Sequence, residues 1–363
     1  MRKVSFPKMG PSHIAFTMML EEFGHEPVKP PVPSKKTLSL GTTYSPEFAC
    51  LPFKVLTGTY LEALEQGADT LVSSGGVGPC RAGYYGIMHE KILNDIGYNP
   101  DMIIFEPPLR APWDFFKKTR KLKGKTSWRG TADILRRTWK KLIALDDLEI
   151  KANKVRPRQK KPGITSRVLN TVLSNIDEAR TFDEIEEARV EGLKSLERVK
   201  KYSDGDSLLG SPLKVGLIGE IYVVLEPSVN ADIEEMLGEL GVEVHRSIYL
   251  TNWTRDNTIA DGEKDVKEAA RPYLDQLIGG HGQNSVGETV LYGENGYAGV
   301  IHLAPFTCIP EIVSKSIMPE ISKKYDIPVL TLFLDEQTGK TGIKTRIEAF
   351  VDLIKKKRQK EAG

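Results

Sequence analysis

A chain of 363 residues, 40% hydrophobic and 28% charged, is long enough to bury a sizeable core and predicts a globular protein of two or more domains. It has no apolar run near the ~18 residues that a membrane helix needs, and its first residues lack the apolar region of a signal peptide, so we expect a cytoplasmic protein outside the membrane. Three widely separated cysteines do not form a secreted disulfide framework, which leaves reduced thiols or metal ligands.

The first part of the chain, residues 1–111, alternates strand and helix patterns. Strands are predicted where short segments rich in β-formers or apolar residues are bounded by Gly or Pro: Lys3–Phe6, Thr37–Gly41, Thr70–Ser74 and Met102–Phe105. Helical patterns that close at a glycine lie between them: one running to Gly24, then Phe53–Gln66 and Ile87–Ile96. Strands that alternate with helices indicate a parallel sheet, so an α/β domain is predicted here.

Residues 112–206 differ, because long charged runs at helical spacing predict a helical insert or bridge. A polar stretch at Ser203–Asp206 ends this segment, and residues 207–363 return to the α/β pattern. The predicted strands and helices of this last part are Leu213–Gly219, Val242–Arg246, Ala298–Leu303 and Pro328–Leu334, with Val229–Leu240, Pro310–Lys324 and Gly342–Lys356. The prediction is two parallel-sheet α/β domains joined by a helical segment.

The net charge of +2 hides a basic segment in the middle of the chain. Residues 110–161 hold 18 Lys and Arg against 5 Asp and Glu. A solvated helical face is the usual explanation of such a run. The alternative is a basic surface that docks an acidic redox partner or meets substrate phosphates. Nucleic acid is not expected as a partner, because no RNA- or DNA-binding module surrounds the segment.

Each of the three cysteines lies in a loop that is predicted to lead from a strand into a helix. Cys50 follows the strand ending at Gly41, Cys80 follows the strand ending at Ser74, and Cys308 follows the strand ending at Leu303. Loops at the carboxyl ends of parallel strands line the crevice where open α/β sheets bind ligands. Two thiols from the first domain and one from the second can therefore meet in the cleft between the domains.

The surroundings of these thiols favour a ligand role. A helix N-terminus presents unpaired N–H groups and a partial positive charge, which predicts a lowered thiol pKa and a stabilised thiolate or anionic cluster. Glycines at positions 75, 76 and 78 would let the backbone approach and donate N–H groups to sulfur, so Gly76 and Gly78 are candidate cofactor-binding residues.

The spacing of the cysteines bears on the choice of metal. Structural zinc uses ligand pairs at short spacing such as C-x2-C, and this sequence has none. Iron-sulfur clusters accept scattered thiolates, and three cysteines on a four-iron cluster leave one iron open. From the residues alone, a pair of core thiols plus one reactive cysteine ranks ahead of a cluster.

Five stretches around these loops resemble one known family. They are Gly41–Lys54 (GTTYSPEFACLPFK), Gly67–Asp69, Gly78–Tyr85 (GPCRAGYY), His302–Glu311 (HLAPFTCIPE) and Asp335–Phe350. Together they resemble the activase-related branch of the 2-hydroxyacyl-CoA dehydratase component family. The likeness covers both α/β parts and leaves the basic middle section unmatched.

This resemblance implies two flavodoxin-like domains that grip a 4Fe-4S cluster in the interdomain cleft through Cys50, Cys80 and Cys308. It implies anaerobic metabolism in which a separate ATP-dependent activase, or another low-potential electron donor, supplies an electron that the cluster passes to a small-molecule substrate such as a CoA thioester. It also implies pairing of related subunits, as a homodimer or heterodimer. The donor must be external, because Leu334 stands where the first glycine of a P-loop ending at Gly339–Thr341 would be.

Other residues are candidates for supporting roles. The glycine-rich stretch Gly279–Glu288 predicts either a mobile turn or a backbone nest for an anion, with His281, Ser285 and Glu288 as candidate catalytic residues. His302, inside an apolar strand, is predicted to be a structural histidine. Arg81 could offset cluster charge or orient an anionic substrate. Glu47 and Glu311 flank cysteines, where either could cap a helix or reach the open iron.

Three functions therefore compete at this level. The leading hypothesis is a reductase or dehydratase-like component whose cluster delivers single electrons to a substrate at the open iron. The second is a cluster-bearing electron-transfer protein or scaffold with no substrate of its own. The third is a metal-free α/β binding protein in which the cysteines are incidental.

Overall fold

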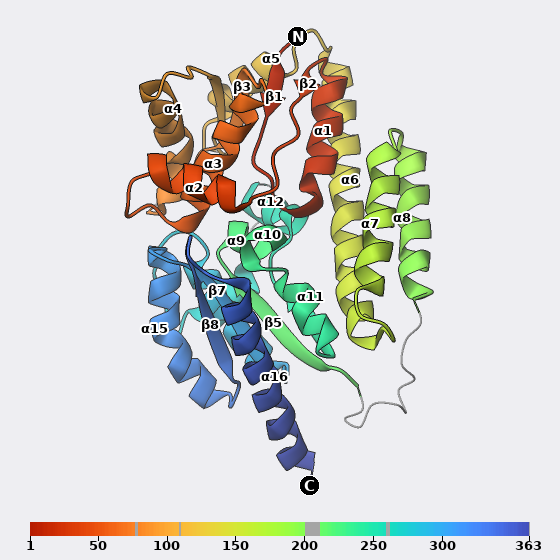
Figure 1. The fold of residues 1–363 in the computed structure, drawn as a ribbon, viewed down its shortest axis with the longest axis vertical. Helices are drawn as coiled ribbons and strands as arrows, with labels where there is room; N and C mark the ends of the chain where they lie inside the picture. Colours follow the sequence, from red (N-terminus) through yellow and green to blue (C-terminus); the bar gives the residue numbers. More distant parts are fainter. Residues whose placement is uncertain (77–78, 109, 200–210, 259–261, 363) are drawn as a thin grey trace.

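The computed structural model describes every residue except 77–78, 109, 200–210, 259–261 and 363. Two four-stranded, all-parallel sheets form two α/β domains, and a set of long helices lies alongside both of them, so the predicted fold class is confirmed (Figure 1). The predicted boundary between residues 206 and 207 lies outside the described residues.

The first domain is built on the sheet order β2-β1-β3-β4. Its strands are β1 (Lys3–Ser5), β2 (Glu26–Pro27), β3 (Thr70–Ser74) and β4 (Asp101–Phe105). Its helices are η1 (Gly10–Ser12), α1 (His13–Glu22), α2 (Lys35–Tyr44), α3 (Leu51–Glu65), η2 (Arg81–Tyr84) and α4 (Tyr85–Asp95). Strand β2 was not predicted, because two residues that include a glutamate and a proline carry no strand pattern.

The predicted strand at Thr37–Gly41 is wrong, because this segment lies inside helix α2. The side chain of Ser34 accepts a hydrogen bond from the backbone N–H of Thr37, and the side chain of Thr37 accepts one from the backbone N–H of Ser34, which makes a capping box at the helix start. A Cβ atom at Gly41 would lie 1.9 Å from the carbonyl oxygen of Lys54, and one at Gly58 would lie 2.0 Å from that of Thr37. Glycines thus let α2 and α3 pack in backbone contact, and this packing outweighs the strand propensity of the segment.

The middle of the chain is helical, as predicted, and contacts both domains. It holds α5 (Pro112–Leu122), α6 (Trp128–Val155), η3 (Arg156–Arg158), α7 (Ile164–Glu178) and α8 (Phe182–Glu197). Apolar residues of α6, including Leu145 and Leu148, form one core with α7, α8 and Ile14 of α1. On its other side α6 holds the second domain through Glu149, which pairs with the buried Arg246 at 2.7 Å. The segment is therefore a common support for the two domains.

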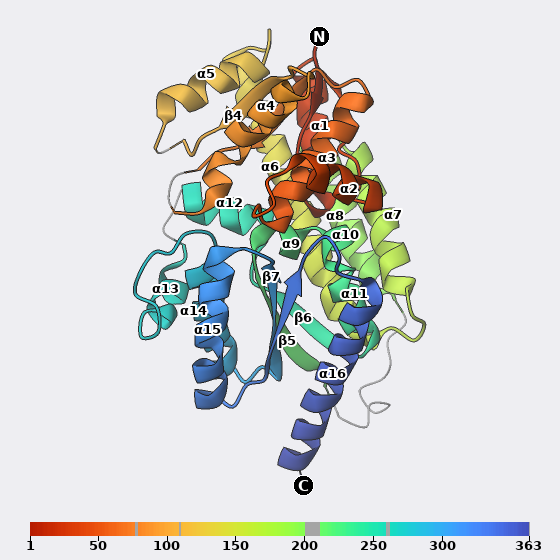
Figure 2. The ribbon, with the colours of Figure 1, turned by 60° about the vertical axis from the view of Figure 1, so that its left-hand side comes forward.

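The second domain repeats the architecture of the first, with the sheet order β6-β5-β7-β8. Its strands are β5 (Leu213–Gly219), β6 (Val242–Arg246), β7 (Gly299–Pro305) and β8 (Val329–Leu334). Its helices are α9 (Ile221–Leu225), α10 (Pro227–Asn230), α11 (Ile233–Glu239), α12 (Leu250–Thr258), α13 (Lys264–Ala270), α14 (Gly282–Glu294), α15 (Ile309–Lys324) and α16 (Lys340–Ala362). Figure 2 shows α14 and α15 on one side of this sheet and α11 and α16 on the other.

One predicted helix of this domain, Val229–Leu240, is two. Helix α10 ends and α11 begins around Ala231 and Asp232, whose φ angles are 64° and 58°. Left-handed backbone at two successive residues interrupts the ladder of helical hydrogen bonds.

In both sheets the first strand lies between the second and the third, which is the flavodoxin-like arrangement. The chain therefore leaves the first and third strands of each sheet in opposite directions, and the carboxyl ends of these two strands form the crevice where such sheets bind ligands. Cys80 follows the third strand of the first sheet and Cys308 follows the third strand of the second. The two cysteines thus occupy equivalent positions in the two domains.

The domains contact each other through buried polar groups. Lys8 pairs with Glu226 at 3.2 Å, and the backbone N–H of Gly10 donates to the same carboxylate at 2.9 Å. Lys54, one turn after Cys50, pairs with Glu336 of the second domain at 2.9 Å. Among the described residues, no helix is both long and apolar enough to cross a lipid bilayer.

Candidate metal centre

Each cysteine is the residue immediately before a helix. Cys50 precedes α3, Cys80 precedes η2 and Cys308 precedes α15, all with extended backbone. For Cys80 and Cys308 the predicted position between a strand and a helix is confirmed. For Cys50 it is wrong, because the preceding element is helix α2 instead of a strand.

One arginine side chain connects the three cysteine loops. Arg81, the neighbour of Cys80, donates from Nη1 to the carbonyl oxygen of Phe48 at 2.7 Å and from Nη2 to that of Thr307 at 2.5 Å. Phe48 lies two residues before Cys50, and Thr307 directly precedes Cys308. The hydroxyl of Thr307 also donates to the Phe48 carbonyl at 3.2 Å. The loops from both domains therefore meet at one place, as predicted from the sequence.

The pKa values of the three thiols are higher than the sequence predicted. Burial raises the pKa of Cys50, of Cys80 and, most of all, of Cys308. The backbone N–H groups at the starts of the three helices lower each pKa, but by less than burial raises it. The prediction of lowered thiol pKa values is therefore wrong for the chain by itself, because desolvation outweighs the helix N-terminus here.

Tyr85 is a neighbour of the thiols that the sequence did not single out. Its hydroxyl lies 2.5 Å from the sulfur of Cys50, and burial raises its pKa well above the usual value. Its ring packs edge-on against Phe53, with centroids 5.1 Å apart. A tyrosine that remains protonated can donate its hydroxyl hydrogen to a thiolate. The sequence feature that could have identified Tyr85 is its place at the end of the stretch GPCRAGYY.

Glu220 is a second site residue that sequence reasoning missed. It directly follows β5, the first strand of its sheet, and its carboxylate accepts a hydrogen bond from the N–H of Val223 at 3.1 Å. Burial raises the pKa of Glu220 to about 7, and the nearby charge of Glu311 adds to this. The charge of Glu220 in turn contributes to the raised pKa of all three thiols. Its position after a strand that borders the ligand-binding crevice could have identified it.

A buried polar network lies beside Cys308. Glu311 is fully buried, and its Oε2 accepts from the hydroxyl of Ser285 at 2.8 Å and lies 2.7 Å from Nε2 of His302. The other ring nitrogen of His302 lies 3.3 Å from the hydroxyl of Thr331. His302 is thus held on both sides, in agreement with its predicted structural role. The candidate Ser285 is brought to the helix that begins after Cys308.

The glycine-rich stretch approaches Cys80. A Cβ atom at Gly280 would lie 3.5 Å from the sulfur of Cys80, so this backbone borders the thiol directly. His281, the next residue, is buried, and burial lowers its pKa. The pKa of Glu288, further along α14, is raised to about 7 by burial and by the charge of Glu263 instead of by the thiols.

Of the two glycines predicted to bind the cofactor, one is described. A Cβ atom on Gly83 would lie 2.5 Å from the carbonyl oxygen of Gly76, so these backbones touch within the Cys80 loop. Gly78 lies outside the described residues. The role of both glycines stays a prediction.

The donor set bears on which metal group could bind. Among the described residues, no three His, Cys, Asp or Glu side chains converge closely enough to hold a single metal ion. Zinc would require convergence, because each thiolate lies about 2.3 Å from it. A four-iron cluster takes its thiolates on separate irons and needs three thiols around a shared space, with N–H groups near the sulfurs. The three thiols lie at three helix starts, on loops from both domains that one arginine ties together, and a backbone N–H at each start favours negative charge on the sulfur.

The basic middle segment contributes ion pairs within the molecule. Arg137 pairs with Glu22 at 2.5 Å, and Arg158 pairs with Glu243 at 2.8 Å. The aromatic side chains of Trp113 and Trp128 in the same segment are exposed. Part of the local positive charge is thus balanced by neighbouring acidic groups.

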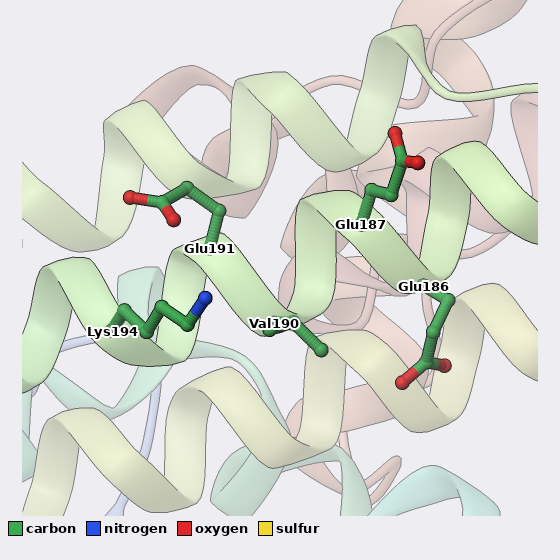
Figure 3. Close-up of a pocket in the computed structure, with 5 residues that line it drawn as sticks. All are labelled: Glu186, Glu187, Val190, Glu191 and Lys194. Carbon is green, nitrogen blue, oxygen red and sulfur yellow. The ribbon is translucent and has the colours of Figure 1, made fainter.

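A surface hollow on α8 is unrelated to the cysteines. Figure 3 shows its lining, which comes from successive turns of this one helix: Glu186, Glu187, Val190, Glu191 and Lys194. Two of its carboxylates are already paired, Glu186 with Arg189 at 2.6 Å and Glu191 with Arg198 at 2.9 Å. This hollow offers no converging set of free polar groups.

Comparison with protein-family models and with curated proteins finds no match to this chain. Membership of the dehydratase component family therefore stays a prediction, supported by the five sequence stretches that resemble that family. The case for a metal centre rests on the geometry of the three cysteine loops.

Proposed function

We propose that the chain is an iron-sulfur protein that holds one 4Fe-4S cluster through Cys50, Cys80 and Cys308 and leaves one iron open. The observation that carries this proposal is the pair of hydrogen bonds from Arg81 to the carbonyls of Phe48 and Thr307, which gathers three cysteine loops from two domains. When bound, such a cluster would supply single electrons at a potential that its surroundings set.

The surrounding residues have definable roles in this proposal. The N–H groups of Phe53, Ala82 and Glu311 lie where they favour negative charge on the three sulfurs. The hydroxyl of Tyr85 is placed to donate to the sulfur of Cys50. Hydrogen bonds to sulfur and low solvent exposure are the levers by which a protein sets the potential of a cluster.

The partners follow from the sequence resemblance. The electron would come from an ATP-dependent activase or another low-potential donor, and the substrate would be a small molecule, of which a CoA thioester is the leading candidate. The resemblance also supports a homodimer or heterodimer. It further supports a cytoplasmic protein with a role in anaerobic metabolism.

Anaerobic reconstitution of the full chain with iron and sulfide tests the proposal. We expect about four irons and four sulfides per chain and an electron paramagnetic resonance signal after dithionite reduction. Replacement of any one cysteine by serine should lower the iron content, whereas Tyr84→Phe, an exposed change on the Cys80 loop, should retain it. A wild-type chain that binds no iron under these conditions contradicts the proposal.

A second candidate function is electron transfer or scaffolding by the same cluster without a substrate. It is favoured by exposed apolar side chains on all three cysteine loops, namely Phe48 (75% exposed), Tyr84 (67%), Phe306 (58%) and Ile309 (58%). Apolar groups gathered on a surface are typical of protein docking sites. A cluster spectrum that stays unchanged with thioesters and other small anions would support this candidate.

If the third candidate, a metal-free α/β binding protein, is right, the three cysteines bind no common metal group. A Cys308→Ser chain with unchanged colour, oxygen sensitivity and stability would support it.

A further inference from the structure

Glu311 has one carboxylate oxygen that is buried and unused. Its side chain is 0% exposed, and Oε2 takes the hydrogen bonds of both Ser285 and His302. Oε1 has no hydrogen-bond partner among the described residues. A buried acceptor without a partner is costly, on the order of 1–3 kcal/mol and more for a charged group, so this oxygen calls for a partner from outside the chain, either a water molecule or a metal ion.

The position of Glu311 relates it to the thiols. Cys308 is the N-cap of α15 and Glu311 is the third residue of that helix, two positions whose side chains are neighbours at a helix start. The charge of Glu311 contributes to the raised pKa of Cys308 and of Cys80. The free oxygen therefore belongs to a carboxylate that neighbours two of the three proposed ligands.

Glu220 and Glu47, two other carboxylates near the cysteines, are less suited to bind a metal. Glu220 uses Oε2 to cap helix α9 through the N–H of Val223. Glu47, three residues before Cys50, is exposed, so water can satisfy both of its oxygens. Glu311 alone among the three combines full burial, a fixed orientation and an oxygen without a partner.

We propose that Glu311 is a fourth protein ligand of the cluster, whose Oε1 would bind the iron that no cysteine holds, so that this iron is open only when the carboxylate is displaced. This inference rests on the proposed function, because it requires the three-cysteine cluster. Ser285 and His302 act as positioning residues, because they hold Oε2 and thereby fix the carboxylate, as hydrogen-bonded partners commonly do for metal ligands. A substrate or inhibitor would reach this iron by displacing the carboxylate.

The experiment compares reconstituted wild-type, Glu311→Gln and Glu47→Gln chains. Glutamine keeps the shape of Glu311 and an acceptor for Ser285 and His302 but removes the anionic oxygen. The two variants are matched, because each lacks one negative charge three residues from a cysteine. The measurements are iron and sulfide content, the electron paramagnetic resonance spectrum of the reduced chain, and the dissociation constant of cyanide as a probe of the open iron.

The expected result is separable from that of the proposed function. Glu311→Gln should retain its iron and sulfide, change the spectrum, and bind cyanide at least about tenfold more tightly, because cyanide no longer competes with a carboxylate that occupies most of the sites. Glu47→Gln should match the wild-type chain in all three measurements. If the wild-type chain holds a cluster and Glu311→Gln has the same spectrum and the same cyanide affinity, the inference is wrong and the proposed function stands. If the wild-type chain holds no cluster, the proposed function itself fails.

Two further variants keep the test decisive if Glu311→Gln fails to fold. Glu311→Asp keeps the charge but shortens the side chain, and should also tighten cyanide binding. Ser285→Ala removes one of the two groups that orient the carboxylate, and should change the spectrum in the same direction by a smaller amount. Unchanged spectra in both folded variants would overturn the inference.

Discussion

The guanidinium of Arg81 donates to the carbonyl oxygen of Thr307 across 226 residues of sequence, and this hydrogen bond joins the first domain to the second directly beside Cys308. Its other nitrogen holds the loop of Cys50 through Phe48. The fork-shaped, always charged guanidinium suits this role, because it can serve two carbonyls at a fixed separation.

Replacement of Arg81 by alanine should make the three cysteine loops more mobile and should lower the stability of the fold only modestly. Because the two lost contacts are exposed hydrogen bonds to backbone carbonyls, the free energy of unfolding should fall by only about 1–2 kcal/mol. In a chain that has taken up iron, release of iron to a chelator should become several-fold faster. The control is Arg129→Ala, which removes the same charge from α6, outside the cysteine loops. Equal release rates for the two variants would contradict the role given to Arg81.

The reactivity of the thiols in the iron-free chain should follow their burial. Only the thiolate reacts with iodoacetamide, and burial raises the pKa of all three thiols, so labelling at pH 7 should be slow and should accelerate as the pH rises above 9. Cys80 should react first, because it is partly exposed, whereas Cys50 and Cys308 are buried. Mass spectrometry of labelled peptides measures the order, and faster labelling of Cys308 than of Cys80 would contradict this account.

Glu220 should make the iron-free chain less stable as the pH rises through neutrality. Its pKa is raised from 4.5 to about 7 in the folded chain, so the folded chain binds more protons than the unfolded chain between these two values. The stability that the protonated group contributes is complete below pH 4.5 and is lost as the pH rises to about 7 and beyond.

The Glu220→Gln variant should therefore gain stability relative to the wild-type chain at pH 8 and gain less at pH 5. Urea unfolding at the two pH values measures the difference. A gain that is the same at both pH values would show that the pKa of Glu220 is not raised by folding.

The close packing of α2 on α3 predicts a large effect from one methyl group. A Cβ atom at position 58 would clash with the Thr37 carbonyl, so Gly58→Ala should lower the free energy of unfolding by roughly 1–3 kcal/mol or more. The matched control is Gly342→Ala on α16, where no atom lies within 4 Å of the new methyl group. That variant should gain up to about 1 kcal/mol from helix propensity. Similar urea midpoints for the two variants would refute the packing argument.

The sequence identified the parts of the fold that depend on local pattern. Strands such as Leu213–Gly219 and Thr70–Ser74 are confirmed to the residue, because an apolar run bounded by turn residues is a local signal. The strand prediction at Thr37–Gly41 is wrong, because these residues lie in helix α2, whose Gly41 packs against the backbone of Lys54 in another helix. Local patterns carry no information about such contacts.

For the candidate site, too, the sequence predicted some features and missed others. The meeting of Cys50, Cys80 and Cys308 loops followed from topology, although the element before Cys50 was wrong. Tyr85 and Glu220 were missed, because their importance comes from proximity in space to thiols that are distant in the sequence. Burial also reversed the predicted direction of the thiol pKa values, since the sequence reveals a helix start but not the desolvation that accompanies it.

Helix α6 is a long, rigid support that contacts both domains. At 1.5 Å per residue its 28 residues extend about 42 Å, and Figure 1 shows α6, α7 and α8 on the side of the molecule away from α4 and α15. Helix α6 packs on α1 of the first domain and pairs with Arg246 of the second, so it ties the two domains to one rigid element. The cysteine loops join the two domains at a second place through Arg81 and Thr307, so a group bound by all three cysteines would add a further connection between the domains.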